Sequence, residues 1–397
     1  MRTTRFVSLA AAALTVWTIT AVAQQPPPPG GGPGGRPIGG LTPAQQLAFA
    51  AGQRAFARDY TTADGLGPIF NDESCADCHR NGGGSNRTVT RFGRLDRRGD
   101  FDPLAELGGS MVQARGVGTI TTADGSHDFR GERTPPEATI TTLRRSSSLL
   151  GLGLVDAVPD ATWHAIAAAE RIATPDVAGR VHMVVDPVTR RGVAGKFGWK
   201  AQVPTLLLFT ADAMLNEMGI TNPQFRDEPC PQGDCDALAF NPAPALNDDG
   251  RDVESITNFV LMLAPPARGP ISDEARAGEQ VFSEIGCASC HRPLIRTGPS
   301  AFAELNGVEF QPYSDFLLHD MGTLGDGIVQ GQATGREMRT APLWGLRITN
   351  RLLHDGRATT IEQAIGRHDG QGAESRDRFN QLDADRRAAL LAFLRSL

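Results

Sequence analysis

Apolar residues recur at helical spacing in several separate stretches of the chain, whereas the alternation typical of strands is sparse. Thr42 followed by Pro43 is typical of a helix start, because threonine caps the first turn and proline suits its first position. Helices are predicted at residues 42–58, 161–173 and 204–218, from Ser272 onward, and at 383–397. The pattern therefore predicts a mainly α fold with few short strands.

Two of the predicted helices carry an apolar stripe that should pack in a core. The stripes consist of Ala277, Val281 and Ile285 after Ser272, and of Leu390, Leu394 and Leu397 in the last helix. Residues 80–140, by contrast, are rich in Gly, Arg, Asp and Thr and have weak periodicity. We expect long loops there rather than packed elements.

The first 40 residues differ in composition from the rest. Arg2 and Arg5, the apolar run 6–19 and the small residues before position 24 predict a secretory signal peptide over residues 1–23. A membrane anchor is the alternative, but the run is shorter than the about 20 apolar residues that a span needs. Residues 24–40 are nearly all Pro and Gly and predict a linker. We therefore expect an exported, periplasmic protein with no membrane span after signal cleavage.

The 397 residues include 39 Lys and Arg against 45 Asp and Glu, which gives a formal net charge of -6. Because no short stretch is strongly basic, nucleic acid is not expected as a partner. The 40% of hydrophobic residues is sufficient for two cores. A Pro- and Gly-rich break at residues 264–270 predicts the boundary between two domains, which cover residues 41–265 and 266–397.

Each predicted domain contains one Cys-x-x-Cys-His motif, formed by Cys75, Cys78 and His79 and by Cys287, Cys290 and His291. Two thiols at this spacing reach the two vinyl groups of one porphyrin, and the adjacent imidazole ligates its iron. A zinc site built from both Cys-x-x-Cys pairs is the alternative, but it requires two distant segments to converge. We predict two covalently bound haem c groups in two cytochrome c-like domains with long loops.

A third pair, Cys230 and Cys235, is not followed by histidine, and a structural disulfide is predicted there over a redox-active pair. The second axial ligand decides what each haem does. Two strong protein ligands favour electron transfer, whereas an open position lets a small oxygen species bind. The candidates are the histidines outside the motifs, namely His127, His164, His182, His319, His354 and His368.

Several separated segments occur together in a distinctive order: 66–71, 195–201, 317–322, 339–346 and 353–357. With these motifs the chain resembles the di-haem oxidoreductase family, which is related to bacterial di-haem cytochrome c peroxidases and to the MauG and rubber-oxygenase enzymes. The resemblance covers nearly all of residues 41–397. It implies a peroxidase-like enzyme in which the N-terminal haem reacts with peroxide and the C-terminal haem relays electrons.

The resemblance also implies roles for three further residues. His368 follows a predicted helix at 360–367 and matches the second ligand of the C-terminal haem iron, although it could instead be a surface residue at a helix end. Trp199 matches a tryptophan that lies between the haems, and Glu217 lies near the offset of an acid above the reactive iron. The alternatives are a core tryptophan and a helix-surface acid.

The chain departs from the cytochrome c peroxidase pattern in two places. No clear counterpart of the loop with a switchable distal histidine is found near residues 144–148, although His127 could serve as that ligand. The inter-domain calcium of those enzymes uses a Thr-x-Pro segment, which Thr340-Ala341-Pro342 preserves, but its asparagine partner is replaced in the arginine-rich stretch. A guanidinium could therefore stand where calcium would bind.

The expected partners are hydrogen peroxide or a similar small oxygen species and an electron-donor protein such as a small cytochrome or a cupredoxin. Two other functions stay open at this point. One is a di-haem electron carrier without catalysis, and the other is an oxygenase that uses dioxygen on an organic substrate.

Overall fold

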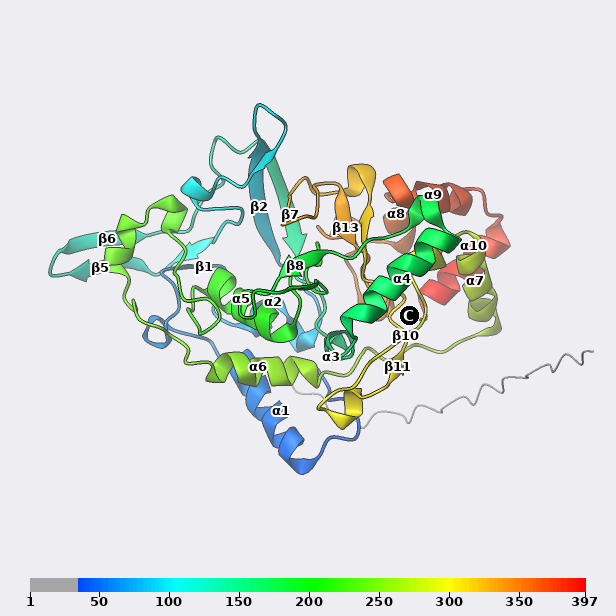
Figure 1. Cartoon of the computed structure of the whole chain (residues 1–397), viewed down its shortest axis with the longest axis horizontal. Coiled ribbons are helices and arrows are strands. Elements are labelled where there is room, and N and C mark those ends of the chain that lie inside the picture. The colour runs from blue at the N-terminus through cyan, green and yellow to red at the C-terminus, as the bar shows by residue number, and fades with distance from the viewer. Residues whose placement is uncertain (1–34) are drawn as a thin grey trace, which may run out of the picture. The chain divides into compact units, whose positions relative to one another are not determined.

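Residues 35–397 are described by a computed structural model, and within them helices and loops predominate over short paired strands (Figure 1). The predicted signal peptide and residues 24–34 of the predicted linker lie outside the described residues. The helices are α1 (Pro43–Phe56), α2 (Cys75–Cys78), α3 (Leu152–Asp156), α4 (Asp160–Ala173), α5 (Leu206–Met218), α6 (Arg251–Leu261), α7 (Asp273–Glu284), α8 (Ile361–Gly366), α9 (Ala373–Asn380) and α10 (Ala384–Leu394).

The strands pair in small antiparallel sheets, and most of them are two to three residues long. They are β1 (Ile69–Phe70), β2 (Thr88–Leu95), β3 (Phe101–Asp102), β4 (Arg115–Gly116), β5 (Gly118–Thr122), β6 (Gly125–Phe129), β7 (Ile140–Arg145), β8 (Met183–Val185), β9 (Gly192–Ala194), β10 (Ile295–Arg296), β11 (Glu309–Phe310), β12 (Leu318–Asp320) and β13 (Glu337–Arg339). The prediction of a mainly α chain is confirmed, although the strands are more numerous than the pattern indicates.

The predicted helices are present, and their first turns are stabilised by polar side chains. Thr42 forms a capping box at the start of α1, and Thr205, Ser272 and Asp383 accept backbone hydrogen bonds at the starts of α5, α7 and α10. Each such cap satisfies an amide that has no partner within the helix. The local sequence therefore fixes where these helices begin.

Helices α7 and α10 lie side by side and form the centre of the smaller of the two main apolar cores (Figure 1). The predicted stripe of α10 is confirmed, since Leu390, Leu394 and Leu397 are all buried. The predicted stripe of α7 is wrong in one position, because Ala277 is exposed. Its place against α10 is taken by Gly278, where an added Cβ would lie 1.9 Å from the carbonyl oxygen of Ala389.

Residues 80–140 are not the loops that the sequence predicts. Strand β2 pairs along six residues with β7 and also with β3, and β5 and β6 form a hairpin. Weak periodicity hides these strands, because the sheet has polar threonines and arginines on positions that are only partly buried. The pairing of β2 with β7 joins segments about fifty residues apart, which no local pattern reports.

The larger core gathers α1 and α3–α6 and extends to Ile295, Leu305 and Phe310 from the C-terminal part. The boundary predicted near residue 265 stays a prediction. Cys230 and Cys235 form a disulfide, as expected, in the loop after α5. Within residues 35–397 no helix is long and apolar enough to cross a bilayer.

Candidate haem centres

The first Cys-x-x-Cys-His motif forms the short helix α2 and the residue after it. Cys75 and Cys78 are not joined by a disulfide, and Cys78 Sγ lies 3.8 Å from a carboxylate oxygen of the buried Asp72. Burial lowers the pKa of His79 to about 4, and its Nδ1 has no hydrogen-bond partner. An imidazole that stays neutral at ordinary pH can act as a metal ligand.

The second motif begins with a single 3-10 turn, Cys287–Ser289, and its histidine is oriented by a hydrogen bond. His291 Nδ1 lies 3.0 Å from the carbonyl oxygen of Tyr313, to which it can donate, so that Nε2 is left free. Burial lowers the pKa of His291 to about 4. Orientation of a ligating imidazole through its other nitrogen is the usual arrangement in metal proteins.

His368 follows the end of α8, and its ring lies near that of His291. The two ring centroids are 6.4 Å apart, and His368 Nδ1 is 2.9 Å from the carbonyl oxygen of Ala364. Two imidazoles that ligate one metal from opposite sides, each with a bond of about 2 Å, have centroids roughly 6 Å apart. The structure thus brings together two neutral, oriented histidines at a spacing that fits an iron between them.

A cavity of about 350 Å³ adjoins this pair. Its lining includes Cys287, His291 and His368. Arg145 Nε and His354 Nε2 belong to residues that also line it, and both atoms are buried without a hydrogen-bond partner. Buried polar groups normally find partners, so these donors suit the carboxylates of a bound haem.

Trp199 lines the same cavity and is fixed in orientation. Its indole N–H donates to the carbonyl oxygen of Arg145 at 3.0 Å, and its ring meets His354 edge-on at 6.3 Å between centroids. Four residues after Arg145, the backbone N–H of Leu149 donates to Gly82, in the turn after His79. Trp199 is therefore linked through residues 145–149 to the first motif and through the cavity to the second.

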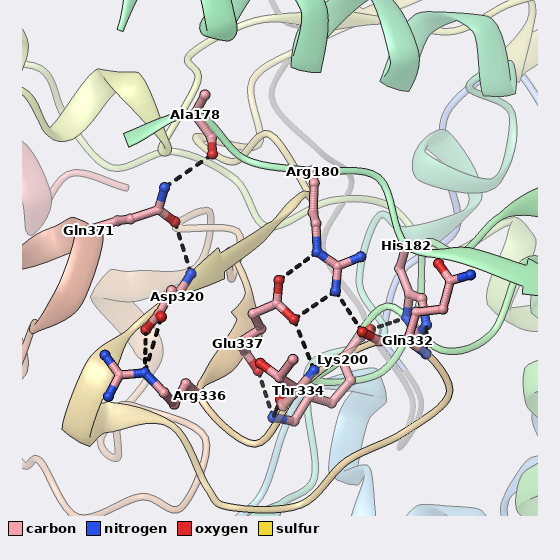
Figure 2. Close-up of polar contacts among 10 residues, drawn as sticks. All are labelled: Ala178, Arg180, His182, Lys200, Asp320, Gln332, Thr334, Arg336, Glu337 and Gln371. Atoms are coloured by element: carbon pink, nitrogen blue, oxygen red, sulfur yellow. Dashed lines mark hydrogen bonds and ion pairs between the residues drawn. The ribbon is translucent and has the colours of Figure 1, made fainter. Parts of the chain in front are cut away.

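A buried ionic cluster holds the segment that carries Trp199. Lys200 Nζ donates to Asp326 Oδ1 at 2.9 Å and to the carbonyl oxygens of Thr334 and Glu337 at 2.8 and 2.6 Å. Figure 2 shows this ammonium group against the backbone at residues 334–337. Arg144 contacts the same carboxylate from the other side, at 2.7 Å.

The electrostatics of this cluster favour its ionised form. Burial alone would raise the pKa of Asp326, but Arg144 and Lys200 together lower it below its ordinary value. The side chains of Asp326 and Lys200 have no exposed surface, and that of Arg144 is 4% exposed. No local pattern in the sequence predicts this cluster. One signal was available: Lys196 and Lys200 are the only lysines in a chain that otherwise uses arginine.

Glu217 lies on α5 beside the first motif. Asn71 Nδ2 donates to Glu217 Oε2 at 2.7 Å, and the Asn71 backbone N–H donates to the Glu217 carbonyl at the same distance. Burial raises the pKa of Glu217, and the charge of Arg91 opposes this shift. Burial and then the charge of Glu217 raise the pKa of Cys78 to about 12, which reflects the proximity of the two groups. Asn71 was not predicted as its partner.

Three other candidate histidines, His182, His127 and His164, are hydrogen-bonded, packed on aromatic rings or exposed. His182 is fully buried, bonded through Nδ1 to Lys200 and through Nε2 to Gln332 (Figure 2). His127 packs on Phe129 and Phe240, in the hairpin at the left of Figure 1. His164 is exposed on α4.

His319 is paired with a buried carboxylate, that of Asp315. Its Nε2 lies 2.8 Å from Asp315 Oδ2, and its Nδ1 lies 3.5 Å from Cys290 Sγ. Burial alone would lower the pKa of His319, but the Asp315 carboxylate raises it well above the ordinary value.

The segment 340–342 does not fit a calcium ion at Thr340. The carbonyl oxygen of Thr340 accepts hydrogen bonds from Ser314 Oγ at 2.8 Å and from Arg339 Nη1 at 3.2 Å. Both lone pairs of this oxygen are thus engaged. A guanidinium does approach the Thr-x-Pro segment, but it belongs to Arg339 rather than to the arginines at 144 and 145.

Comparison with solved structures shows several proteins of low identity. Hydrazine synthase from Kuenenia stuttgartiensis is 13% identical (TM-score 0.35; 98% of this chain and 100% of that chain covered). A MauG-like protein associated with microbial copper homeostasis is 16% identical (TM-score 0.40; 96% and 95%). The diheme peroxidase BthA from Burkholderia thailandensis E264 is 15% identical (TM-score 0.37; 88% and 86%). No curated protein matches the chain.

The family comparison carries the assignment. Residues 137–397, well over half of the chain, match the family described as "Di-haem oxidoreductase, putative peroxidase". This range includes the second Cys-x-x-Cys-His motif, His368, Trp199 and Glu217. The chain therefore belongs to the di-haem oxidoreductase family and is a peroxidase-like oxidoreductase.

Proposed function

We propose that the protein is a periplasmic di-haem c-type peroxidase whose N-terminal haem reacts with hydrogen peroxide and whose C-terminal haem relays electrons. In this proposal Cys75 and Cys78 attach one haem and Cys287 and Cys290 the other. The electrons come from a donor protein such as a small cytochrome or a cupredoxin. The predicted signal peptide is the reason for a periplasmic location.

The observation that carries the proposal is the asymmetry of the two centres. His291 faces His368 at a spacing suited to one metal between them, which would close that iron to other ligands. Beside the first motif the groups near Cys78 are instead carboxyl groups, namely the buried Asp72, 3.8 Å from Cys78 Sγ, and the partly buried Glu217. One closed and one reactive centre is the division of labour that a peroxide-reducing di-haem enzyme needs.

A bound haem iron supplies the redox chemistry and the site for an oxygen ligand. The protein must move a proton between the two peroxide oxygens so that water can leave. Glu217 suits this role, because burial raises its pKa above the ordinary value and Asn71 fixes Oε2, which leaves Oε1 to take and release the proton. Trp199, which lines the cavity and donates to the carbonyl oxygen of Arg145, suits electron transfer between the centres.

The electron paramagnetic resonance spectrum of the oxidised holoprotein tests the proposal, because it distinguishes high-spin from low-spin iron. We expect one low-spin signal from the His291–His368 centre and one high-spin signal from the His79 centre. Addition of peroxide should then change the high-spin signal first. Two low-spin signals that do not respond to peroxide, even after partial reduction, would instead identify an electron carrier.

A further inference from the structure

The chain has two tyrosines, and each is buried beside one of the haem motifs. The backbone N–H of Tyr60 donates to the carbonyl oxygen of Glu73 at 2.8 Å, two residues before Cys75. The carbonyl oxygen of Tyr313 contacts His291 in the second motif. Tyrosine is among the few side chains that can be oxidised by one electron. A tyrosine beside a haem motif could therefore pass single electrons to that centre.

Tyr60 has a proton acceptor in place. Its hydroxyl donates to Asp252 Oδ2 at 3.1 Å, and Arg58 Nη2 contacts the same oxygen at 2.8 Å. The Arg58 guanidinium also lies over the phenol ring, 4.0 Å from its centroid. Oxidation of a phenol releases its proton, so a carboxylate already bonded to the hydroxyl lowers the barrier to electron loss.

The same group borders a cavity of about 360 Å³. Tyr60, Arg58 and Asp252 line it, together with Asp64 and Asp248. Tyr60 itself is only 2% exposed, whereas the side chains of Arg58 and Asp252 are 44% and 30% exposed. Tyr60 is thus bonded to the segment just before the first haem motif and also lines a cavity that is large enough for one aromatic ring.

We propose that Tyr60 is a redox-active tyrosine through which a small phenolic reductant, bound in this cavity, delivers single electrons to the N-terminal haem centre. This inference rests on the proposed function, because peroxide is the oxidant. It adds a second route for electrons, independent of the donor protein and of the C-terminal centre.

The steps balance as follows. An oxidising equivalent left at the N-terminal centre by peroxide removes one electron from Tyr60, the phenolic O–H bond breaks, and the proton moves to Asp252 Oδ2. A phenolic donor in the cavity then returns one electron to the tyrosyl oxygen, which regains its proton from Asp252, and the oxidised donor releases its own proton to water. Two such cycles use both oxidising equivalents of one peroxide and yield two molecules of water and two donor radicals.

The charge of the cavity defines the class of donor. Three aspartates, Asp64, Asp248 and Asp252, and one arginine, Arg58, are the charged residues of its lining. The excess of negative charge disfavours anionic reductants and favours neutral or cationic ones. Hydroquinone is therefore the expected kind of donor, and ascorbate is the matched anionic control.

Tyr313 supplies an internal comparison. Its hydroxyl also donates to a carboxylate, Glu279, at 2.7 Å. In contrast to Tyr60, its oxygen also accepts a hydrogen bond from Arg268 at 3.2 Å, and its ring packs on Phe282 and Phe393. Tyr313→Phe is therefore the control substitution for Tyr60→Phe.

The test is freeze-quench electron paramagnetic resonance of the holoprotein after one equivalent of hydrogen peroxide, with natural and with ring-deuterated tyrosine. We expect an organic radical signal that narrows on deuteration, is lost in Tyr60→Phe and persists in Tyr313→Phe. Asp252→Asn keeps the phenol but removes its proton acceptor, and should slow radical formation by roughly a hundredfold. A signal that survives in Tyr60→Phe, or that does not narrow, would overturn the proposal.

A second arm separates this inference from the proposed function. A photogenerated one-electron oxidant replaces peroxide in the same holoprotein, so Tyr60 is tested even if peroxide leaves both haem spectra unchanged. If the photo-oxidant produces the tyrosyl signal and peroxide produces none, the peroxide chemistry is refuted while Tyr60 is still shown to be redox-active.

A third arm tests the donor. Hydroquinone should remove the radical in wild type faster than ascorbate by roughly tenfold or more, an on-rate difference that electrostatic selection can supply. Equal rates for the two would contradict the cavity as the donor site.

Discussion

Glu217 is a carboxyl group whose pKa is raised by burial next to the first haem motif. We predict that Glu217→Gln leaves both haems attached but slows peroxide turnover by roughly a hundredfold or more, the scale of losing a general acid-base group. Stopped-flow reaction with peroxide measures this, and absorbance of the attached haems is the control. Turnover equal to that of wild type would remove Glu217 from the reaction.

The raised pKa of Glu217 also gives the turnover a pH dependence. The group must accept a proton, so the active fraction falls as the pH drops through its pKa, which lies above the ordinary value of about 4.3. Wild-type turnover should therefore decline on the acid side, whereas the residual turnover of Glu217→Gln should stay flat over the same range. An unchanged acid limb in the variant would assign it to another group.

His368 is predicted to ligate the second iron opposite His291. His368→Ala should convert the low-spin signal of that centre to high-spin, because one strong ligand is lost. His182→Gln is a suitable control, since His182 is also a histidine away from the surface but is bonded to Lys200 and Gln332. A low-spin signal that persists in His368→Ala would show that another side chain is the ligand.

Between elements, the approach of α7 to α10 depends on the absence of a side chain at Gly278. We predict that Gly278→Ala destabilises the protein by about 1–3 kcal/mol, the usual cost of overpacking, because the new Cβ meets the Ala389 carbonyl. Gly366→Ala in α8 is the matched control: an added Cβ there has no neighbour within 4 Å, so the change should be neutral or slightly stabilising. Thermal unfolding of the two variants distinguishes these outcomes.

The elements also show what a sequence can report. Helix starts were predicted closely, because capping is decided by two or three neighbouring residues such as Thr42 and Pro43. The sheet of β2 and β7 was missed, since its partners are distant in sequence and its polar and apolar residues do not separate into an exposed and a buried face: Leu95 and Leu143 are exposed, whereas Arg144 is buried. The exposed Ala277 was misassigned because the direction of a helix face depends on the helix that packs against it.

In the candidate centres, too, some features could be expected from the sequence and others could not. His368 was singled out by the resemblance to the family, which supplies a long-range relation that no local pattern contains; its role as an iron ligand stays a prediction. The contact of Asn71 with Glu217 and the burial of Lys200 depend on where separate segments meet, so no local pattern indicated them.

Across the whole molecule, the cluster of Arg144, Lys200 and Asp326 ties residues about 180 positions apart. Asp326→Asn should destabilise the protein by about 3–5 kcal/mol, because it leaves buried cations without a counter-charge. The exposed Asp249→Asn, which removes a carboxylate from a surface pair, is the control and should change stability little. Denaturant unfolding measures both.

The same cluster predicts an acid response. The pKa of Asp326 is lowered in the folded protein, so its contribution is complete above the unfolded value of about 3.9 and is lost as the pH falls through the folded value. Wild type should therefore lose stability below about pH 4, and Asp326→Asn should lose less. Parallel pH profiles of the two would contradict this account.

Lys200 should not tolerate replacement by arginine. Its compact ammonium group donates to one carboxylate and two carbonyl oxygens in a space with no exposed surface, whereas a planar guanidinium needs a wider arrangement of acceptors. We expect Lys200→Arg to lower the thermal midpoint and to perturb the fluorescence of the adjacent Trp199. Lys196→Arg makes the same substitution at the other lysine, also without a change of charge, and should have a smaller effect.

The disulfide between Cys230 and Cys235 has an analytical consequence. It consumes two of the six cysteines, and the remaining four are those of the two haem motifs. If each motif attaches one haem as proposed, titration of free thiols in the denatured, unreduced chain reports maturation: a fully loaded chain should have none, and each haem that fails to attach should leave one pair. Thiol stoichiometry can thus score haem loading chain by chain, without reference to colour, spin state or turnover.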